Sequence, residues 1–243
     1  MKAQGKASSV SVYFRSMPSG YAFGINPYEK YYPASLLKVP TMIAYLKAGM
    51  DDIGLLVKKV KFAKPFENMP MNNIPDKLEL GKEYTISELM VRMLISSDND
   101  ATMLLHQNID PKCYPNTLKE LELNIPEMVR EDDNYLSVID YSRIWRILYN
   151  ASYLNQNNSN YVLMLLSKAI FGEGIPAGTP GKTLAHKFGE WDYNGTIQLH
   201  DCGIVYYGDN TYMLSIMTKG KIGHHLSLPL LIFPKQCRIL CII

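Results

Sequence analysis

The two ends of the chain carry strand-like patterns, whereas the middle carries helical ones. Near the start, SVSVYFR (9–15) alternates apolar and polar residues, SMPSG (16–20) reads as a turn, and YAFGI (21–25) follows. From 35 to about 170, apolar residues recur with helical spacing. Strand patterns then return as TLAHKF, GTIQLHDCGIVYY and TYMLSIMTKG. This order predicts an α+β fold in which both chain ends form one antiparallel sheet and a helical lobe is inserted between them.

A chain of 243 residues is long enough to fold as one large domain. We expect a single domain in two lobes, an α/β lobe from 1–34 and 171–243 and a helical lobe from 35–170. Within the helical lobe, Thr85 with Glu88 three residues later is a capping-box signature for a helix start. The apolar tail from 221 to 243 fits no single helix, because Pro229 and Pro234 interrupt it.

Charge and composition exclude several classes of protein. A net charge of +2, with no basic stripe, argues against a nucleic-acid partner. We expect no membrane span, because no run of about 18 apolar residues occurs. The first residues lack the apolar core of a signal peptide, so any export segment would lie outside this sequence. The oligomeric state stays open.

The cysteines do not indicate a metal site. Their positions are Cys113, Cys202, Cys237 and Cys241, with no CxxC pair among them. Zinc ligation is therefore not expected. Cys202 fits better as an apolar strand residue. We expect no metal ion and no organic cofactor.

The stretch YYPASLLKVPTMIAYLKAG (31–49) places Ser35 three residues before Lys38, at the start of an apolar helical run. One interpretation is a helix N-cap serine followed by a solvated lysine. The other is a nucleophile with its base one turn away, within reach of the hydroxyl. A helix that is apolar on all sides is buried, and burial lowers the pKa of a lysine enough to make it a base. Pro40, inside this helix, removes a backbone hydrogen bond, which ordinary helix propensity would not favour.

Two further short motifs follow along the chain. Ser97-Asp98-Asn99 falls between two expected helices, and its ordinary interpretation is a helix cap. Lys187-Phe188-Gly189 lies on the first strand after the glycine-rich stretch FGEGIPAGTPGK (171–182). For this motif the ordinary interpretation is an exposed strand lysine.

Together, on helix, interhelix loop and strand, the three motifs resemble those of the serine penicillin-recognising enzymes, and of class A β-lactamases in particular. The set in that family is S-x-x-K, S-D-N and K-T-G. The flanking stretches YYPASLLKVP, SSDNDA, HKFGEW and HDCGIVYY add to the resemblance, which runs from about residue 9 to residue 220. It implies a β-lactamase/transpeptidase-like fold and a covalent acyl-enzyme formed with a β-lactam or a peptidoglycan stem peptide. It also implies a location outside the cytoplasmic membrane.

The resemblance assigns a role to each matching residue. Ser35 would attack the carbonyl, and Lys38 would take its proton. Ser97 would relay a proton to the departing nitrogen, and Asn99 would hold the substrate's side-chain amide. Lys187 would supply positive charge for Ser97 and for the substrate carboxylate.

The resemblance also implies an oxyanion hole. Its two donors would be the backbone N–H groups of Ser35 and of Glu190, which directly follows Gly189. Two such donors stabilise a tetrahedral intermediate, and losing one typically costs about 10²–10³ in rate.

The chain departs from the family pattern at Phe188, where relatives usually carry a threonine or serine. That hydroxyl helps to bind the substrate carboxylate, so substrate preference is open at this position. Asn194, Thr196 or a water molecule could supply a replacement polar group.

A second departure concerns deacylation, for which class A enzymes use a glutamate on a loop between the second and third motifs. The corresponding stretch, LELNIPEMVREDDNYLSVIDY, is short and lacks the usual glutamate-x-x-asparagine signature. The candidate carboxylates are Glu122, Glu127, Glu131, Asp132 and Asp133, and their ordinary interpretation is a solvated acidic turn. Without this base the acyl-enzyme should form but break down slowly.

Three functions are therefore compatible with the sequence. The first is a serine hydrolase of the class A β-lactamase type with weak deacylation, which we favour. The second is a penicillin-binding D-alanyl-D-alanine carboxypeptidase, which needs the three motifs but no loop glutamate. The third is a catalytically inactive relative that keeps the fold as a binding module.

Overall fold

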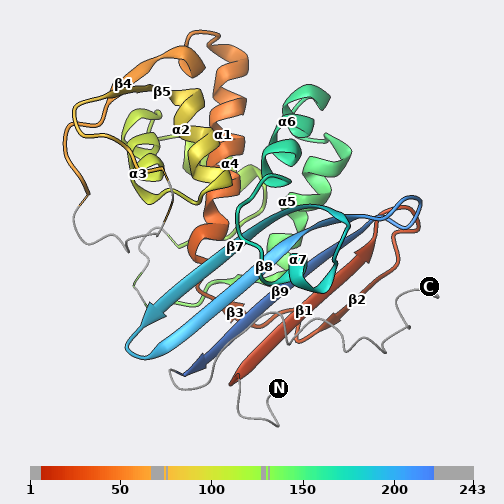
Figure 1. Ribbon diagram of the computed structural model, residues 1–243. Helices are drawn as coiled ribbons and strands as arrows, with labels where there is room; N and C mark the ends of the chain where they lie inside the picture. Colours follow the sequence, from red (N-terminus) through yellow and green to blue (C-terminus); the bar gives the residue numbers. More distant parts are fainter. Residues whose placement is uncertain (1–6, 67–73, 75, 127–129, 131, 222–243) are drawn as a thin grey trace.

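A five-stranded antiparallel sheet, in the order β2-β1-β9-β8-β7, forms the base of the molecule (Figure 1). The computed structural model describes residues 7–66, 74, 76–126, 130 and 132–221. The strands of the sheet are β1 (Ser9–Ser16), β2 (Ala22–Ile25), β7 (Thr183–Tyr193), β8 (Thr196–Tyr206) and β9 (Tyr212–Lys221). β1 pairs with β9 over its whole length, so both ends of the described chain meet in one sheet. The predicted α+β fold is confirmed.

The pairing of β7 with β8 positions the third motif. Their register runs from Thr183 opposite Tyr206 to Tyr193 opposite Thr196, and only two residues connect the strands. These two, Asn194 and Gly195, have φ angles of 49° and 74°. A two-residue hairpin loop with two positive φ angles matches the twist of the strands, which is why Asn-Gly is favoured there.

The helices lie between β2 and β7 in the chain and cover one face of the sheet. Their bounds are α1 (Lys38–Asp51), α2 (Ile86–Ile95), α3 (Asn99–Asn108), α4 (Cys113–Glu120), α5 (Val138–Asn150) and α6 (Gln156–Leu166). The short α7 (Ile175–Gly178) lies on the opposite face of the sheet (Figure 1). Short elements complete the fold: the 3₁₀ helices η2 (Ala34–Leu37) and η3 (Leu55–Val57), and the strand pairs β3 (Lys30–Tyr31) with β6 (Leu136–Ser137) and β4 (Lys59–Lys61) with β5 (Glu83–Thr85).

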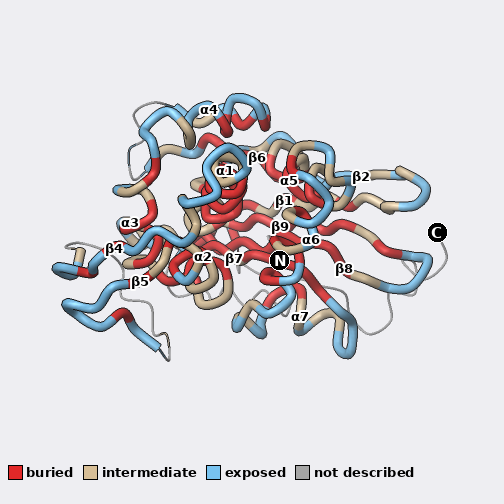
Figure 2. The backbone as a smooth tube through the Cα atoms, turned by 90° about the horizontal axis from the view of Figure 1, so that it is seen from above, coloured by how far each residue is buried: buried red, intermediate tan, exposed pale blue. Residues whose placement is uncertain are grey.

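The core lies between the helices and the sheet, where buried residues gather around α1 and the middle of β7, β8 and β9 (Figure 2). Every residue of α1 from 38 to 46 is buried. Trp145 and Tyr141 of α5 are buried in the same core. The apolar helix that carries Lys38 is therefore central, as its sequence predicts.

Local sequence signals account for several element boundaries. Thr85 and Glu88 form the predicted capping box at the start of α2. Pro40 lies in the first turn of α1, where a proline costs less than in the helix interior. Its missing N–H would have bonded the Leu36 carbonyl, which instead accepts a hydrogen bond of 2.8 Å from the buried Tyr141 hydroxyl. The expected cost of Pro40 is thus offset by a side chain of α5.

Other predictions from the sequence meet the structure only in part. Cys202 is a buried strand residue, as predicted, and Cys113 is a partly exposed free thiol. Cys237, Cys241 and the tail from 222 onward lie outside the described residues, and the lobe boundaries at 34 and 170 stay predictions. Within the described chain, no helix is long and apolar enough to cross a membrane. The same residues contain no cluster of three or more side chains suited to a metal ion.

Candidate active site

Ser35 and Lys38 lie at the junction between η2 and α1. Side chains at i and i+3 eclipse one another in a 3₁₀ helix, so the side chains of Ser35 and Lys38 project from the same side of this turn. The Lys38 N–H donates to the Leu36 and Ser35 carbonyls across this turn. The chain enters η2 through Ala34, which has a φ of 49°. Ser35 is partly exposed, whereas Lys38 is buried.

The Lys38 amine is directed at the loop of the second motif. Its Nζ donates to Ser97 O over 2.6 Å, to Ser97 Oγ over 3.0 Å and to Asn99 Oδ1 over 2.6 Å. Among the hydrogen bonds of the described residues, none joins Lys38 Nζ to Ser35 Oγ. The amine therefore lies one turn along from Ser35, as the motif predicts, but it is held by residues about 60 positions later in the chain.

Burial changes the acid–base properties of Lys38. Desolvation lowers the pKa of its amine to about 7, and the nearby Asp98 charge opposes that shift. Roughly half of the amines are then neutral at pH 7. A neutral amine at this pH can accept a proton, which a solvated lysine cannot.

The second motif combines a helix cap with two inward-facing side chains. Asp98 is the N-cap of α3, and its Oδ1 accepts from the Ala101 N–H over 3.0 Å, as the ordinary interpretation of the motif predicts. Burial raises the pKa of the Asp98 carboxyl. Ser97 has a φ of 55°, an uncommon backbone conformation for a residue other than glycine. The backbone turn at Ser97 is followed by Asn99, and the side chains of both residues accept hydrogen bonds from the Lys38 amine.

Lys187 completes the polar cluster from β7. Its side chain is fully buried, so the interpretation as an exposed strand lysine is wrong. Its Nζ donates to Ser97 Oγ and to the Phe188 carbonyl, each over 3.0 Å. Burial, followed by repulsion from Lys38, lowers the pKa of the Lys187 amine well below its ordinary value. The three motifs therefore meet at one atom, the Ser97 hydroxyl oxygen.

Gly189 sets the distance between β7 and η2. A Cβ at this position would lie 2.8 Å from the Pro33 carbonyl oxygen and 3.2 Å from Leu36 Cγ. Only a residue without a side chain allows this approach. Because of it, the segment that carries Ser35 lies directly beside the strand that carries Gly189 and Glu190. The predicted oxyanion-hole donors thus belong to neighbouring segments.

The candidate carboxylates for deacylation form no hydrogen bond with this cluster or lie outside the described residues. Glu122 forms an exposed ion pair with Arg143 over 3.2 Å. Asp133 accepts from the Arg130 N–H over 2.8 Å. In the described part of the chain, no hydrogen bond joins Glu122, Asp132 or Asp133 to the residues of the three motifs. Glu127 and Glu131 are not among the described residues.

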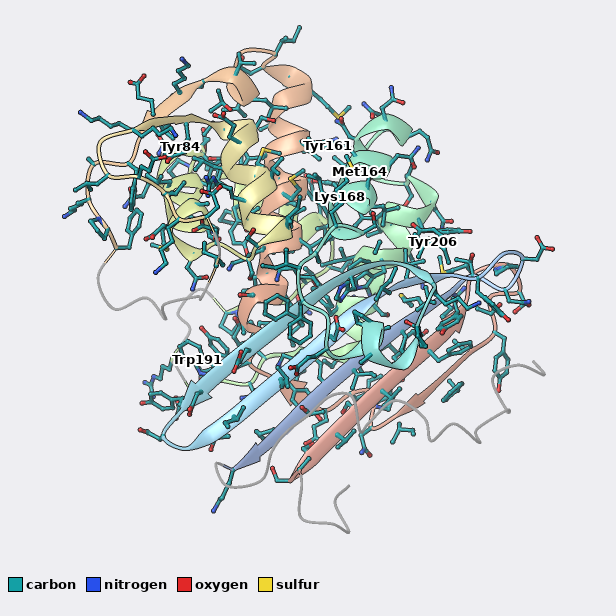
Figure 3. The ribbon with its side chains drawn as sticks, viewed as in Figure 1. Tyr84, Tyr161, Met164, Lys168, Trp191 and Tyr206 are labelled. Carbon is teal, nitrogen blue, oxygen red and sulfur yellow. The ribbon has the colours of Figure 1, made fainter. Side chains whose placement is uncertain are left out.

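Trp191 lies near the end of β7 (Figure 3), where it lines a cavity of about 370 Å³. Asp132 and Gln198 line it together with Trp191. The Trp191 ring stacks on Tyr32 with their centroids 4.6 Å apart. Trp191 is two residues beyond Gly189, so this cavity adjoins the segment in which the oxyanion hole is expected.

Sequence reasoning missed Tyr32, Tyr141, Phe171 and Asp201 as supporting residues. Of these, only Asp201 could have been identified from the sequence. It lies within the apolar strand pattern HDCGIVYY, where a carboxylate is buried on one face of the sheet or the other and needs a partner. In the structure it is fully buried and accepts from His186 Nδ1 over 2.8 Å.

Comparisons with known proteins agree with the fold and the motifs described above. A sequence model of the beta-lactamase enzyme family matches residues 1–227. No curated protein gives a significant match. Among solved structures, PBP-A superimposes with a TM-score of 0.75 at 20% identity, over 88% of this chain and 82% of that one. A penicillin G acyl-enzyme complex of a PBP-A mutant gives 0.75 at 21% identity, over 90% and 84%.

Two bacterial β-lactamases show the same fold. The enzyme from Sphaerobacter thermophilus DSM 20745 superimposes with a TM-score of 0.73 at 20% identity, over 92% of this chain and 88% of that one. The class A enzyme from Mycobacterium abscessus gives 0.74 at 21% identity, over 89% and 86%. At these identities the structural match concerns the fold.

Proposed function

The chain belongs to the beta-lactamase enzyme family, and from that premise we propose that it is a serine hydrolase acting through a covalent acyl-enzyme. Its substrates would be β-lactams or the acyl-D-alanine peptides of peptidoglycan, and it would act outside the cytoplasmic membrane. One observation carries the proposal: the Lys38 amine, with a pKa of about 7, shares the Ser97 hydroxyl with Lys187 and lies one turn from Ser35.

Acylation would begin at Ser35. The neutral Lys38 amine takes the hydroxyl proton as Ser35 Oγ forms a bond to the substrate carbonyl carbon. Rotation of the Lys38 side chain from Asn99 toward Ser35 brings the amine to the hydroxyl. Burial supports this role, because a base with a pKa near the operating pH is the most effective one.

Ser97 would pass a proton to the leaving nitrogen. Its Oγ accepts from both lysine amines over 3.0 Å, and a hydroxyl has two lone pairs and one proton. With both lone pairs engaged, that proton is what the hydroxyl donates. Lys38, protonated in the first step, then returns a proton to Ser97. Asn99 would bind the substrate's side-chain amide when Lys38 turns toward Ser35.

The oxyanion would form between two backbone donors, the N–H groups of Ser35 and Glu190. The close approach at Gly189 supports this placement, because it brings β7 against η2 with no side chain between them. Donors fixed in rigid backbone stabilise the charge that develops in the transition state without reorganisation.

We propose further that the acyl-enzyme breaks down slowly. Hydrolysis needs a base to activate water beside Ser35. Glu122 and Asp133 are engaged with other groups, and Asp132 is an exposed residue of the cavity at Trp191 with no hydrogen bond to the three motifs. This observation also favours a second function, a penicillin-binding D-alanyl-D-alanine carboxypeptidase, for which rapid hydrolysis of β-lactams is not required. A binding module without catalysis is the third candidate, and the buried pair of lysines argues against it, because burial of two amines side by side lowers stability.

Intact mass spectrometry after mixing with penicillin G tests the proposal. We expect an adduct of one penicillin on Ser35 that persists for hours, absent in Ser35→Ala. An adduct that clears quickly would overturn the slow-deacylation claim and identify an efficient lactamase. No adduct on a folded sample would overturn the serine-hydrolase proposal.

Base variants add a matched control. Lys38→Ala should slow acylation by orders of magnitude, whereas Lys47→Ala should not. Lys47 lies on the same helix, partly exposed, with its amine over the Tyr153 ring. Equal rates in the two variants would remove Lys38 from the role of base.

A further inference from the structure

The Lys187 amine has no hydrogen-bond donor left for a ligand. In its charged form it has three N–H groups, and within the described chain these face Ser97 Oγ, the Phe188 carbonyl and the Phe188 ring, whose centroid lies 4.0 Å from Nζ. In its neutral form it has two N–H groups, which the two oxygens engage. In either state, the N–H groups of Lys187 are already engaged by neighbouring groups of the protein.

The Phe188 ring is itself fixed by a second aromatic residue. Phe171, in the segment before α7, stacks on Phe188 with centroids 4.2 Å apart and an interplanar angle of 15°. Both rings are partly exposed. The side of Lys187 that faces away from Ser97 is therefore a two-ring apolar wall, formed by Phe171 and Phe188, whose outer surface meets solvent.

A buried carboxylate anchors the segment that brings Phe171 to this position. Asp201 Oδ2 accepts from the Ile175 N–H over 2.8 Å, while Asp201 Oδ1 is held by His186. Gly174 has a φ of 70°, and a Cβ there would lie 2.5 Å from Asp201 Oδ2. The hydrogen bond at Ile175, the positive φ of Gly174 and its close contact with Asp201 all lie within five residues of Phe171. They fix the backbone that positions Phe171 against Phe188.

No side-chain hydroxyl of the β7–β8 hairpin replaces the one missing at position 188. Thr196 pairs with Tyr193, five residues along β7 from Phe188. At about 3.3 Å per residue, Thr196 and the neighbouring Asn194 lie roughly 16 Å away. The two side chains that the sequence suggested as substitutes are therefore too distant to share a ligand group with Lys187.

We propose that the aromatic wall of Phe171 and Phe188 makes this enzyme prefer substrates that carry no carboxylate beside the scissile bond. This inference rests on the proposed function and narrows its substrates to neutral lactams, amides or esters. It therefore argues against acyl-D-alanine peptides and the carboxypeptidase alternative, whose scissile bond lies beside a carboxylate. A carboxylate placed against two ring faces loses its hydration without gaining donors, which is costly. A neutral ester or amide at the same place gains apolar contact.

Penicillin G and its methyl ester test this preference, because they differ only in that carboxylate. The rate constant for acylation of Ser35 is measured for each by intact mass spectrometry and divided by that compound's rate of hydrolysis by hydroxide. For the wild-type protein we expect the ester to react at least as fast as the acid after this correction. An acid that reacts about tenfold faster or more would overturn the inference, since a charge-assisted hydrogen bond is worth that much.

Phe188→Thr restores a hydroxyl donor and should raise the acid-to-ester ratio about tenfold. The matched control is Phe23→Thr, the same change on β2 at the opposite edge of the sheet, where Phe23 stacks on Phe14. An unchanged ratio in folded Phe188→Thr would contradict the role of the wall. If Phe188→Thr does not fold, the wild-type ratio decides alone. Failure of both compounds to label wild-type Ser35 would instead overturn the proposed function, and this inference with it.

Discussion

Lys38 and Lys187 donate hydrogen bonds to the same atom, Ser97 Oγ, each over 3.0 Å. Two amines on one oxygen cannot both carry a full charge without strong repulsion, since each is also buried. Burial and proximity together keep the cluster partly neutral at neutral pH. That property is what a serine–lysine mechanism requires.

The first prediction is a pH dependence of acylation set by Lys38. The rate of labelling of Ser35 by penicillin G should rise about tenfold per pH unit below pH 7 and level off above it, because the neutral amine is the base. Asp98→Asn should move the midpoint to lower pH, since the Asp98 charge raises the pKa of Lys38. Labelling rates between pH 5 and pH 9 measure both effects. A flat profile, or a midpoint that Asp98→Asn leaves in place, would contradict this assignment.

The second prediction is that Lys38 lowers the stability of the fold. Its pKa falls from 10.5 to about 7 on burial, which corresponds to a cost on the order of 5 kcal/mol for the charged form. Lys38→Met removes that cost but also removes the three hydrogen bonds of the amine, so a net gain of about 2 kcal/mol at pH 7 is expected.

The gain should depend on pH in a defined direction. The penalty is present below the folded pKa of about 7 and fades as pH rises toward 10.5, where the unfolded lysine also becomes neutral. Urea denaturation of both proteins at pH 7 and pH 9.5 tests this. A Lys38→Met variant that is less stable at pH 7, or whose advantage grows with pH, would show that the amine stabilises the fold.

The sheet could be predicted from the sequence because its strands are long and alternate regularly. β7, β8 and β9 each span at least ten residues, enough for the period of two to stand out. The short strands β3, β4, β5 and β6 were not predicted, because two or three residues carry no measurable period. Their pairing depends on tertiary contacts, as does the placement of α4.

The site could be predicted only as a set of motifs. The sequence identifies Ser35, Lys38, Ser97 and Lys187 by type and order, but the Lys38 amine points to a loop that packs against it from 59 residues away. The spacing of residues within the motif does not show which distant groups the Lys38 amine contacts. Phe171 lacks any motif of its own, and its position follows from a contact to the buried Asp201 through Ile175.

The third prediction concerns the contact between β7 and η2. Gly189→Ala would place a Cβ 2.8 Å from the Pro33 carbonyl oxygen and 3.2 Å from Leu36 Cγ, so one segment must shift. The shift moves Ser35 relative to Glu190, and acylation should fall about 10²-fold, as for loss of one oxyanion donor. Gly172→Ala is the control, since a Cβ there meets nothing within 4 Å. Penicillin labelling rates of the two variants measure the effect, and equal rates would show that the approach at Gly189 is not critical.

The fourth prediction concerns the Tyr141 hydroxyl and Pro40. Proline at position 40 has no N–H, so the Leu36 carbonyl accepts from Tyr141 over 2.8 Å inside the core. Tyr141→Phe removes the hydroxyl donor from that buried carbonyl, which keeps the Lys38 N–H, and should cost about 1 kcal/mol of unfolding free energy. Pro40→Ala restores a backbone N–H to the first turn of α1, in position to bond the same carbonyl. Tyr141→Phe should therefore cost less in the Pro40→Ala background, by about 1 kcal/mol in a double-mutant cycle measured by urea denaturation. Strictly additive effects would mean that the hydroxyl and the missing N–H act independently, and the account of this helix start would be wrong.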